Sequence, residues 1–459
     1  IDLDFAVPAD VDGLNPTSSA FSNSGINMAL AVFDTLAVYD TDGNPVPYLA
    51  ESFEADASFT KWTMKVREGI TFHDGTSLNA DAVVVNFEGQ LSDPLVSMAI
   101  NPFFVQEGDK ITKIDDYTVQ FNLGFPDARF PSKLTGQIGM VASPAWLATT
   151  VEDGRLDQNP VGTGPFVFDM RMEDSSTKFV KNENYWNGEV KADSVTFHPV
   201  TDPAVAFALL SEGNIDAMYT VNMPALQSAL DDTDKYKTII EGDGEETMLM
   251  FNAQSANPAM QDIRVREALT LATPVLKYNT LISLDIPEKA NSMFPPSSPF
   301  YNANVVQKTD DIEAAKLKLE EYCADPESAC VDGRVTVEYQ HSGPSIIGTR
   351  IAELYQTAWE DAGFVVNVQE LAQDIHIQET IFGAYDIVSW RQLGSPVPED
   401  ELLWLSSVTI GPLSLNFPRW ANAERDQLMF GAASSFNQPL DSWNVSNVIT
   451  LEHMFSECL

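Results

Sequence analysis

The order of hydrophobic periods along the chain constrains its fold more than any other feature. Segments in which every second residue is apolar predict half-buried strands, and segments with apolar residues three or four apart predict helices. The two kinds alternate from about Val195 to Trp390, which is typical of an α/β protein in which helices cover a sheet. Strand-type segments dominate from about Tyr48 to Val141. The sequence therefore predicts an α/β protein with an additional strand-rich part.

Three segments show the strand period clearly. They are Lys61–Val66, Thr118–Phe125 and Arg334–Tyr339. In each, the apolar side chains would lie on one face of a sheet because successive residues of a strand point to opposite faces. We therefore expect strands that bury one face.

Several helix-type segments follow residues that cap helices. Asn79, Asp262 and either Asp310 or Asp311 stand just before such segments. Their side-chain oxygens can accept hydrogen bonds from the first free amide groups of a helix. We predict helices that begin after these residues, the last of which buries Ile312, Ala315, Leu319 and Tyr322.

Length and charge limit the classes of function. The 459 residues suggest about three domains at roughly 150 residues each. The 67 acidic residues against 26 Lys and Arg give a net charge of −41, which repels phosphate backbones and anionic lipid. Ala82–Phe87 is among the longest apolar runs, far short of the roughly 18 residues of a membrane helix. We expect a monomeric protein that binds neither nucleic acid nor a membrane surface.

Two of the three cysteines lie close together in the sequence. Cys323 and Cys330 flank the loop ADPESA, and Cys458 stands alone near the end of the chain. A disulfide between the first two would suit an oxidising compartment. The alternative is two unrelated thiols, and the sequence leaves both open.

Two glycine motifs have structural interpretations. Gly162 and Gly164, in NPVGTGPF, permit backbone angles that other residues resist. This loop lacks the Lys-Ser/Thr pair and the spacing of a phosphate-binding loop. The His73-Asp74-Gly75 run follows a strand and is expected to form a turn rather than a catalytic site.

Nothing in the sequence points to catalysis. The five histidines are scattered without the spacing of metal ligands, and no G-x-S-x-G motif occurs. Carboxylates are so abundant that a pair of them is uninformative. We expect no catalytic residues, no metal and no cofactor.

A set of longer motifs follows one order along the chain. The motifs are Leu49–Glu88, Asn159–Phe166, Asn182–Gly188, Val195–Met218, Phe251–Ala272, Asp361–Glu370 and Phe382–Trp390. In content and order they resemble the peptide, nickel and opine-type solute-binding proteins of ABC transporters, known as family 5, over about Ile1 to Met429.

The resemblance implies a periplasmic-binding-protein fold of type II, with two lobes joined by a hinge. Residues 1–32 and 160–247 would form lobe I, with a strand-rich subdomain at 33–159, and 248–429 would form an incomplete lobe II. A peptide or other small polar solute would bind between the lobes, and closure would trap it for the membrane permease. The resemblance also implies a periplasmic or extracellular location, with a lipid anchor as one means of attachment.

The family pattern also implies which residues contact the ligand. The contacts from the first lobe would come from the segment before Val32–Leu36, and those from the second lobe from the YDIVSW strand and the residues after it. Trp420 lies where the family often has an aromatic residue near the cleft. The expected ligand contacts are Phe21, Ser22, Asn23, Trp390, Arg391, Gln392 and Trp420. For each Trp the alternative is core packing, and for Arg391 it is a surface ion pair.

One departure from the family concerns the ligand. Peptide-binding members usually have an Asp shortly after this Trp, which pairs with the α-amino group of the peptide. Here no acid follows Trp390 until Glu399. A buried ammonium without a counter-charge costs several kcal/mol. We therefore expect Arg391 to meet a carboxylate, a phosphate or a sugar hydroxyl of a ligand that is not held by its amino terminus.

The last thirty residues do not continue the family pattern. Phe430–Leu459 resembles one repeat of the BspA-like surface proteins, which are relatives of leucine-rich repeats. A single solenoid repeat cannot bury its own apolar face. Either a repeat array was fused and cut short, or two unrelated reading frames are joined, which we favour. Both would leave lobe II without its closing elements, and we expect a destabilised chain.

Two further classes of function remain as alternatives. The chain could be a cell-surface interaction protein whose first BspA-like repeat is the tail, in which case the gene beyond Leu459 would hold further copies. A secreted hydrolase would instead have to show turnover in a substrate screen.

Overall fold

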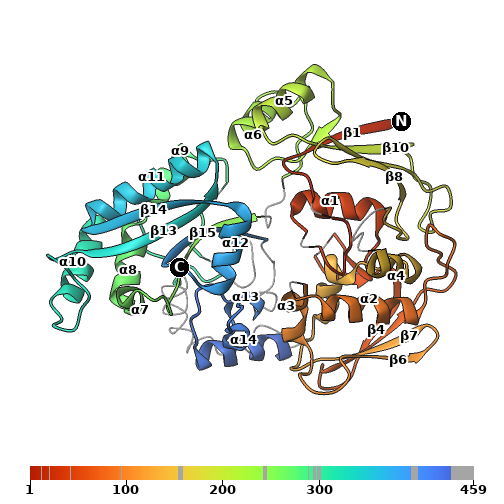
Figure 1. Ribbon diagram of the computed structural model, residues 1–459, viewed down its shortest axis with the longest axis horizontal. Coiled ribbons are helices and arrows are strands. Elements are labelled where there is room, and N and C mark those ends of the chain that lie inside the picture. The colour runs from red at the N-terminus through yellow and green to blue at the C-terminus, as the bar shows by residue number, and fades with distance from the viewer. Residues whose placement is uncertain are drawn as a thin grey trace. The chain divides into compact units, whose positions relative to one another are not determined.

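The computed structural model describes residues 1–435 apart from 12, 20, 42, 95, 154–158, 241–244, 288, 293–295, 297–300 and 394–401. The chain forms two compact units, which are labelled by element in Figure 1. Unit 1 is built chiefly from Ile1–Lys237 and unit 2 chiefly from Thr238–Ala432.

The first sheet of unit 1 has the order β11-β1-β10-β9-β8. β1 runs parallel to β10 and β11, and β8 and β9 form an antiparallel hairpin beside them. Buried apolar residues of β1, β9 and β10 pack with those of α1 and α4 in one core. The strands are β1 (Asp2–Val7), β8 (Phe166–Met172), β9 (Ser176–Lys181), β10 (Ser194–Pro199) and β11 (Ala217–Met218).

The second sheet of unit 1 is an antiparallel sheet of order β4-β5-β7-β6. Helix α2 packs against it, and its Phe87 contacts Phe121 of β7 with ring centroids 5.0 Å apart. A shorter pair, β2 with β3, completes the strands of this unit. The strands are β2 (Ala37–Tyr39), β3 (Pro45–Pro47), β4 (Ala50–Ala55), β5 (Lys61–Val66), β6 (Ile111–Asp115) and β7 (Thr118–Asn122).

The helices of unit 1 lie mainly around these sheets. Short 3₁₀ helices occur at Asn101–Phe103, Phe130–Leu134 and Gln137–Gly139. The α-helices are α1 (Asn23–Val32), α2 (Ala80–Ser92), α3 (Val96–Ile100), α4 (Pro144–Asp153), α5 (Pro203–Glu212) and α6 (Met223–Leu230).

Unit 2 has one sheet of order β12-β15-β13-β14, in which β13, β14 and β15 are parallel and β12 is antiparallel. The strands are β12 (Glu245–Phe251), β13 (Val335–Gly343), β14 (Phe364–Ala372) and β15 (Ile387–Leu393). The α-helices are α7 (Pro258–Gln261), α8 (Ile263–Ala272), α9 (Val275–Leu281), α10 (Ile312–Cys323), α11 (Ile346–Asp361), α12 (Gln373–Phe382), α13 (Leu402–Leu405) and α14 (Ala423–Ser435), with a 3₁₀ helix at Ser407–Thr409.

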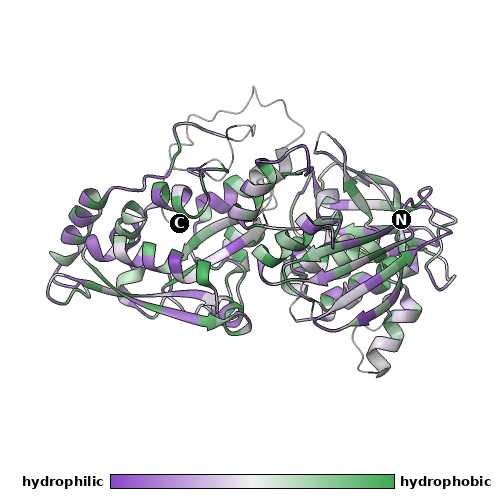
Figure 2. Ribbon diagram, turned by 90° about the horizontal axis from the view of Figure 1, so that it is seen from above, coloured by the Kyte–Doolittle hydropathy of each residue, from purple (hydrophilic) through white to green (hydrophobic). Residues whose placement is uncertain are grey.

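Helices α8, α10 and α11 of unit 2 each bury one apolar stripe. The fully buried Trp359 of α11 packs with Leu269 of α8, Leu319 of α10 and Val337 of β13 in a single core. Figure 2 shows the matching pattern, since many helices carry both hydrophobic and hydrophilic bands. The layered α/β arrangement agrees with the alternation of periods in the sequence.

The three predicted helix caps are confirmed. The side chains of Asn79, Asp262 and Asp311 accept hydrogen bonds from the amides of Ala82, Arg264 and Ala314, at the starts of α2, α8 and α10. The structure also joins Cys323 to Cys330 in a disulfide at the end of α10. Local sequence signals were therefore sufficient for the caps, while the structure decides between the two alternatives that the sequence left open for the cysteines.

The prediction for Gly162 and Gly164 was wrong in its cause. Neither glycine has a positive φ. Instead, a Cβ on Gly162 would lie 2.0 Å from the carbonyl oxygen of Val32, and a Cβ on Gly164 would lie 2.6 Å from its carbonyl carbon. The glycines are required because two backbone segments touch. The turn at His73-Asp74-Gly75 is confirmed, with Gly75 at φ +82°.

The expected boundary between lobe II and the tail, at Phe430, lies within a helix. Helix α14 runs from Ala423 to Ser435 without a break at that position. Most of the predicted tail, from Phe436 to Leu459, lies outside the described residues.

Candidate functional site

The parallel strands of unit 1 define the edge where its predicted site residues lie. β1, β10 and β11 run in the same direction, so their carboxyl ends meet at one edge of the sheet. In α/β sheets, ligands bind beyond the carboxyl ends of the strands. Helix α1 follows β1 and places its amino-terminal residues at this edge.

The predicted residues of unit 1 surround the start of α1. Ser22 is the N-cap, and its Oγ accepts a hydrogen bond from the amide of Gly25. Asn23 donates through Nδ2 to the hydroxyl of Tyr219, at 2.8 Å. Phe21 is partly buried against the core, with its ring beside Gly25. The structure therefore brings Asn23 to Tyr219, with Ser22 beside it as the helix cap, and packs only part of Phe21 against the core.

Sequence reasoning missed Tyr219. It directly follows β11, so it lies at the same edge as Asn23. The rule that ligands bind beyond carboxyl ends of strands would have selected it. That signal was hidden because β11 has only two residues.

In unit 2, the predicted residues lie near the carboxyl end of β15. Trp390, Arg391 and Gln392 pair with Met248, Thr247 and Glu246 of β12. The side chain of Arg391 is exposed. The side chain of Gln392 lies outside the part of the structure that can be described.

Trp390 lies in an aromatic stack. Its ring is 5.9 Å from the ring of His376 in a stacked arrangement and 4.7 Å from Phe417 in an edge arrangement. Trp390 is half-buried, so part of its surface is covered by these neighbours. Offset and edge contacts of this kind orient an aromatic ring in addition to burying it.

His376 is a second residue that sequence reasoning did not assign. Its Nε2 donates to the carbonyl oxygen of Ser389 at 3.0 Å, which places the proton of the neutral ring on Nε2. Burial lowers the pKa of His376 below its ordinary value. The ring therefore stays neutral near pH 7 and supports Trp390 without adding charge.

Trp420 is more deeply buried than Trp390. Only 8% of its surface is exposed, and the guanidinium of Arg425 lies 4.5 Å from its ring centre. Arg425 also donates to the backbone oxygen of Trp420. This placement favours the core-packing alternative for Trp420.

A buried carboxylate in unit 1 serves the fold. Asp34 is 4% exposed and accepts hydrogen bonds from Trp186 Nε1 at 2.8 Å, Thr163 Oγ1 at 2.9 Å and Tyr185 Oη at 3.0 Å. Burial raises the pKa of Asp34, and these hydrogen bonds oppose that rise. Asp34 thereby joins segments that are far apart in the sequence.

Among the described residues, no group of three or more His, Cys, Asp or Glu side chains is placed to hold a metal ion. In the same part of the chain, no helix combines the length and apolar character needed to cross a bilayer.

Residues 44–410 match the family model of bacterial extracellular solute-binding proteins, family 5 (middle region). Residues 419–459 match a second model, described as a Mycoplasma protein of unknown function, DUF285. The resemblance to family 5 is confirmed. The second match does not name a BspA-like repeat, so the predicted repeat is not shown.

Curated relatives extend over most of the chain. Di/tripeptide-binding protein 2 of Pseudomonas aeruginosa is 25% identical over 414 residues, which cover 85% of this chain and 76% of the relative. Heme-binding protein A of Haemophilus influenzae is 28% identical over 422 residues, covering 85% and 74%. The dipeptide-binding protein of Escherichia coli is 26% identical over 395 residues, covering 82% and 72%.

Solved structures share the fold. A dipeptide-binding protein from Pseudoalteromonas in complex with Met-Leu matches with a TM-score of 0.83 at 20% identity, covering 100% of this chain and 92% of that one. An ABC transporter-associated periplasmic binding protein of Helicobacter pylori, in complex with a peptide, matches with a TM-score of 0.81 at 20% identity, covering 100% and 90%. The predicted two-lobed periplasmic-binding-protein fold is confirmed. The chain belongs to the bacterial extracellular solute-binding proteins of family 5, which are substrate-binding components of ABC transporters and not enzymes.

Proposed function

We propose that this protein captures a peptide or another small polar solute outside the cytoplasm and delivers it to the permease of an ABC importer. The observation that carries this proposal is the family match over residues 44–410. Relatives named for dipeptides, heme and nickel leave the solute itself open.

The residues at the two carboxyl edges supply the ligand contacts in this proposal. Unit 1 contributes Phe21, Ser22 and Asn23, and unit 2 contributes Trp390, Arg391 and Gln392. The hydrogen bond of Asn23 to Tyr219 and the stack of Trp390 on His376 support it, because both fix a side chain at an edge where ligands bind. Trp420 is set aside because Arg425 covers its ring.

Arg391 defines the proposed ligand chemistry. A guanidinium at the end of β15 suits a carboxylate, a phosphate or a sugar hydroxyl. No acid occurs between Trp390 and Glu399 to neutralise the amino terminus of a peptide. Tight binding of ordinary dipeptides that is unaffected by Arg391→Ala would contradict this part of the proposal.

Native mass spectrometry of the purified protein tests the function directly. A solute carried from the host, lost on denaturation and rebound after refolding, is the expected result. A protein that carries nothing and binds nothing in a broad panel of peptides, sugars and metal chelates would refute the proposal.

A second candidate function rests on the match of residues 419–459 to the Mycoplasma family. In this alternative, the chain is a cell-surface interaction protein, held at the surface by a lipid anchor, with a BspA-like array that begins near its end. Sequencing the gene beyond Leu459 separates the two candidates, because further copies of the FNQPL-W-V-S-N pattern are expected only in the second.

A further inference from the structure

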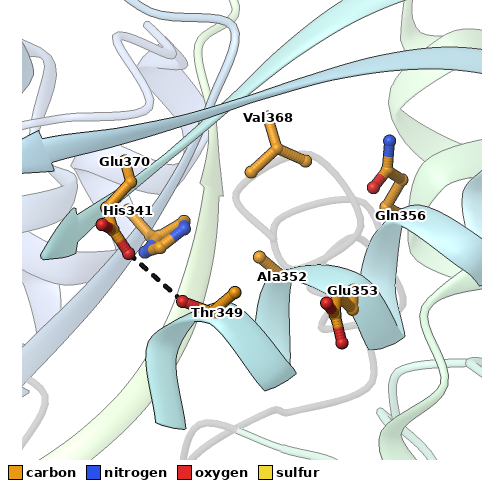
Figure 3. A pocket seen from close by; sticks show the side chains of 7 residues that line it. All are labelled: His341, Thr349, Ala352, Glu353, Gln356, Val368 and Glu370. Carbon is orange, nitrogen blue, oxygen red and sulfur yellow. Dashed lines mark hydrogen bonds between the residues drawn. The ribbon is translucent and has the colours of Figure 1, made fainter. Parts of the chain in front are cut away.

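A pocket in unit 2 lies between helix α11 and the strands β13 and β14 (Figure 3). Its volume is about 360 Å³, enough for one side chain or small head group. His341 of β13 and Glu370 of β14 are directly opposite each other in the sheet. The lining residues are His341, Thr349, Ala352, Glu353, Gln356, Val368 and Glu370.

The lining carries negative charge without a counter-charge. It contains the carboxylates of Glu353 and Glu370 and no Lys or Arg. Among the described residues, neither carboxylate forms an ion pair, and Glu370 accepts only a hydrogen bond from Thr349 Oγ1 at 3.2 Å. Two carboxylates around one pocket favour a cation there.

His341 adds a buried acceptor. It is 3% exposed, and its Nδ1 donates to the backbone oxygen of Ser342 at 3.2 Å. In the neutral ring this leaves a lone pair on Nε2. Within the part of the chain that the structure describes, Nε2 has no hydrogen-bond partner.

The remaining polar groups of the lining also present acceptors. The amide nitrogen of Gln356 donates to Glu360 Oε1 and to the backbone oxygen of Val366, which leaves the amide oxygen as its acceptor. The hydroxyl of Thr349 lies within donating distance of both the backbone oxygen of Ser345 and Glu370. The pocket therefore complements a group that carries several N–H donors and a positive charge.

We propose that this pocket binds a cationic group of the solute, a primary ammonium or a guanidinium, whose alkyl stem lies on Ala352 and Val368. The proposal rests on the proposed function, because it assigns the pocket to the solute-binding edge of unit 2. Tyr339 of β13 pairs with Ile387 of β15, and His341 of β13 pairs with Glu370 of β14. Side chains alternate between the two faces along a strand, so residues an even number of positions apart share a face. His341, Glu370 and Arg391 therefore project from one face of the sheet. A solute that also carries an anionic group then meets Arg391 on the same face of the sheet.

Isothermal titration of the full chain with matched probes tests this assignment. The probes are alanyl-lysyl-alanine, its norleucine counterpart, which lacks only the charged amine of the side chain, and free spermidine. The variants are Glu353→Gln and Glu370→Gln, which remove a charge and keep the shape. Glu320→Gln is the matched control because Glu320 is an exposed glutamate on α10, outside the pocket.

We expect the lysine peptide or spermidine to bind, and each pocket variant to weaken that binding about tenfold, the size of one charge-assisted hydrogen bond. The norleucine peptide should be unaffected, and Glu320→Gln should change nothing beyond about twofold. Preference for the lysine peptide identifies a peptide side chain as the source of the cation, and preference for spermidine identifies a free polyamine. Thermal melts confirm that the variants are folded.

Two results would overturn the assignment. One is equal binding of the lysine and norleucine peptides with no affinity for spermidine. The other is an equal loss of affinity in Glu320→Gln, which would mean that total charge and not the pocket matters. A protein that gives either result but still carries a solute in native mass spectrometry retains the proposed function. A protein that binds no solute at all fails both proposals.

Discussion

At the residue scale, unit 1 depends on a few close contacts between distant segments. Asp34 receives three hydrogen bonds from residues of two later segments. Gly162 and Gly164 flank Thr163 and lie against the backbone of Val32. This close approach allows the hydrogen bond between Thr163 and Asp34. Buried polar groups of this kind are costly when a partner is removed.

Replacement of Asp34 by Ala tests the polar contact. The change removes the carboxylate partner of Thr163 and Trp186, while the hydroxyl of Tyr185 keeps its hydrogen bond with Tyr48. The free energy of unfolding should therefore fall by about 3 kcal/mol. Urea denaturation followed by tryptophan fluorescence measures it. Asp56→Ala is a control, because Asp56 is an exposed acid in a surface turn. A loss in Asp34→Ala no larger than in the control would contradict the role given to Asp34.

Gly162→Ala tests the backbone contact. The new methyl group would lie 2.0 Å from the carbonyl oxygen of Val32, and we expect a loss of about 3 kcal/mol in stability or a failure to fold. Gly136→Ala is the matched control, because no atom lies within 4 Å of its Cβ position and its φ is −109°. Similar stability of the two variants would show that the segments can move apart.

The sequence predicted that Gly162 and Gly164 matter but assigned the wrong reason. Glycine is favoured both where the backbone adopts unusual angles and where another segment approaches closely. A glycine motif alone does not tell these two causes apart. The contact with Val32 depends on tertiary packing, which the local pattern does not contain. Tyr219 and His376 were missed for a related reason, because their roles come from neighbours on other elements.

At the element scale, helix starts were predicted well because a cap is local. Asp262 both caps α8 and pairs with Arg264, whose Nη2 lies 2.6 Å from Oδ2. The hydrogen bond from Arg264 is the main cause that lowers the pKa of Asp262 below its ordinary value. The ionised side chain therefore stabilises the fold above the ordinary pKa of an Asp.

Asp262→Ala should lower the free energy of unfolding by about 1 kcal/mol at pH 7. Because the pKa of Asp262 is lowered in the folded state, this contribution is present above about pH 4 and lost as the pH falls through the folded pKa. The difference between wild type and variant should therefore shrink at acid pH. Urea curves at pH 7 and at acid pH measure it, and a difference that grows on acidification would refute this account.

The disulfide at the end of α10 closes a short loop. Its cysteines are separated by seven positions, for which the loss of chain entropy in the unfolded state corresponds to about 2–3 kcal/mol. The double replacement Cys323→Ser and Cys330→Ser should cost about this much in thermal unfolding. Reduction of the wild type should give the same shift, and Cys458→Ser should give none.

At the scale of the whole molecule, the net charge of −41 opposes compaction. Salt shortens the range of repulsion, from about 10 Å at 0.1 M to about 3 Å at 1 M. We expect the melting temperature to rise with sodium chloride over this range. Sucrose of equal osmolality serves as the non-ionic control. A melting temperature that sodium chloride raises no more than sucrose would show that the acidic surface does not limit stability.

The fold of the whole molecule was predictable because the sequence contains the alternating hydrophobic periods of strands and helices and the family motifs in their expected order. The site was predictable only in part. Residues such as Asn23 and Arg391 were selected from the family pattern, and the structure places Asn23 beside the end of β11 and Arg391 near the end of β15. The pocket beside α11 could not, since its seven lining residues come from three elements that only the parallel pairing of β13 and β14 brings together.

The hydrogen bond from the amide of Gly164 to the carbonyl oxygen of Val32, at 3.0 Å, has a consequence for how the protein can change over generations. The chain leaves this point after Val32 and returns to it at Gly164, so the intervening stretch has neighbouring ends. A stretch of this kind can lengthen, shorten or be exchanged in a lineage while the flanking sheet keeps its connections. The glycines mark the junction at which this stretch rejoins the rest of unit 1.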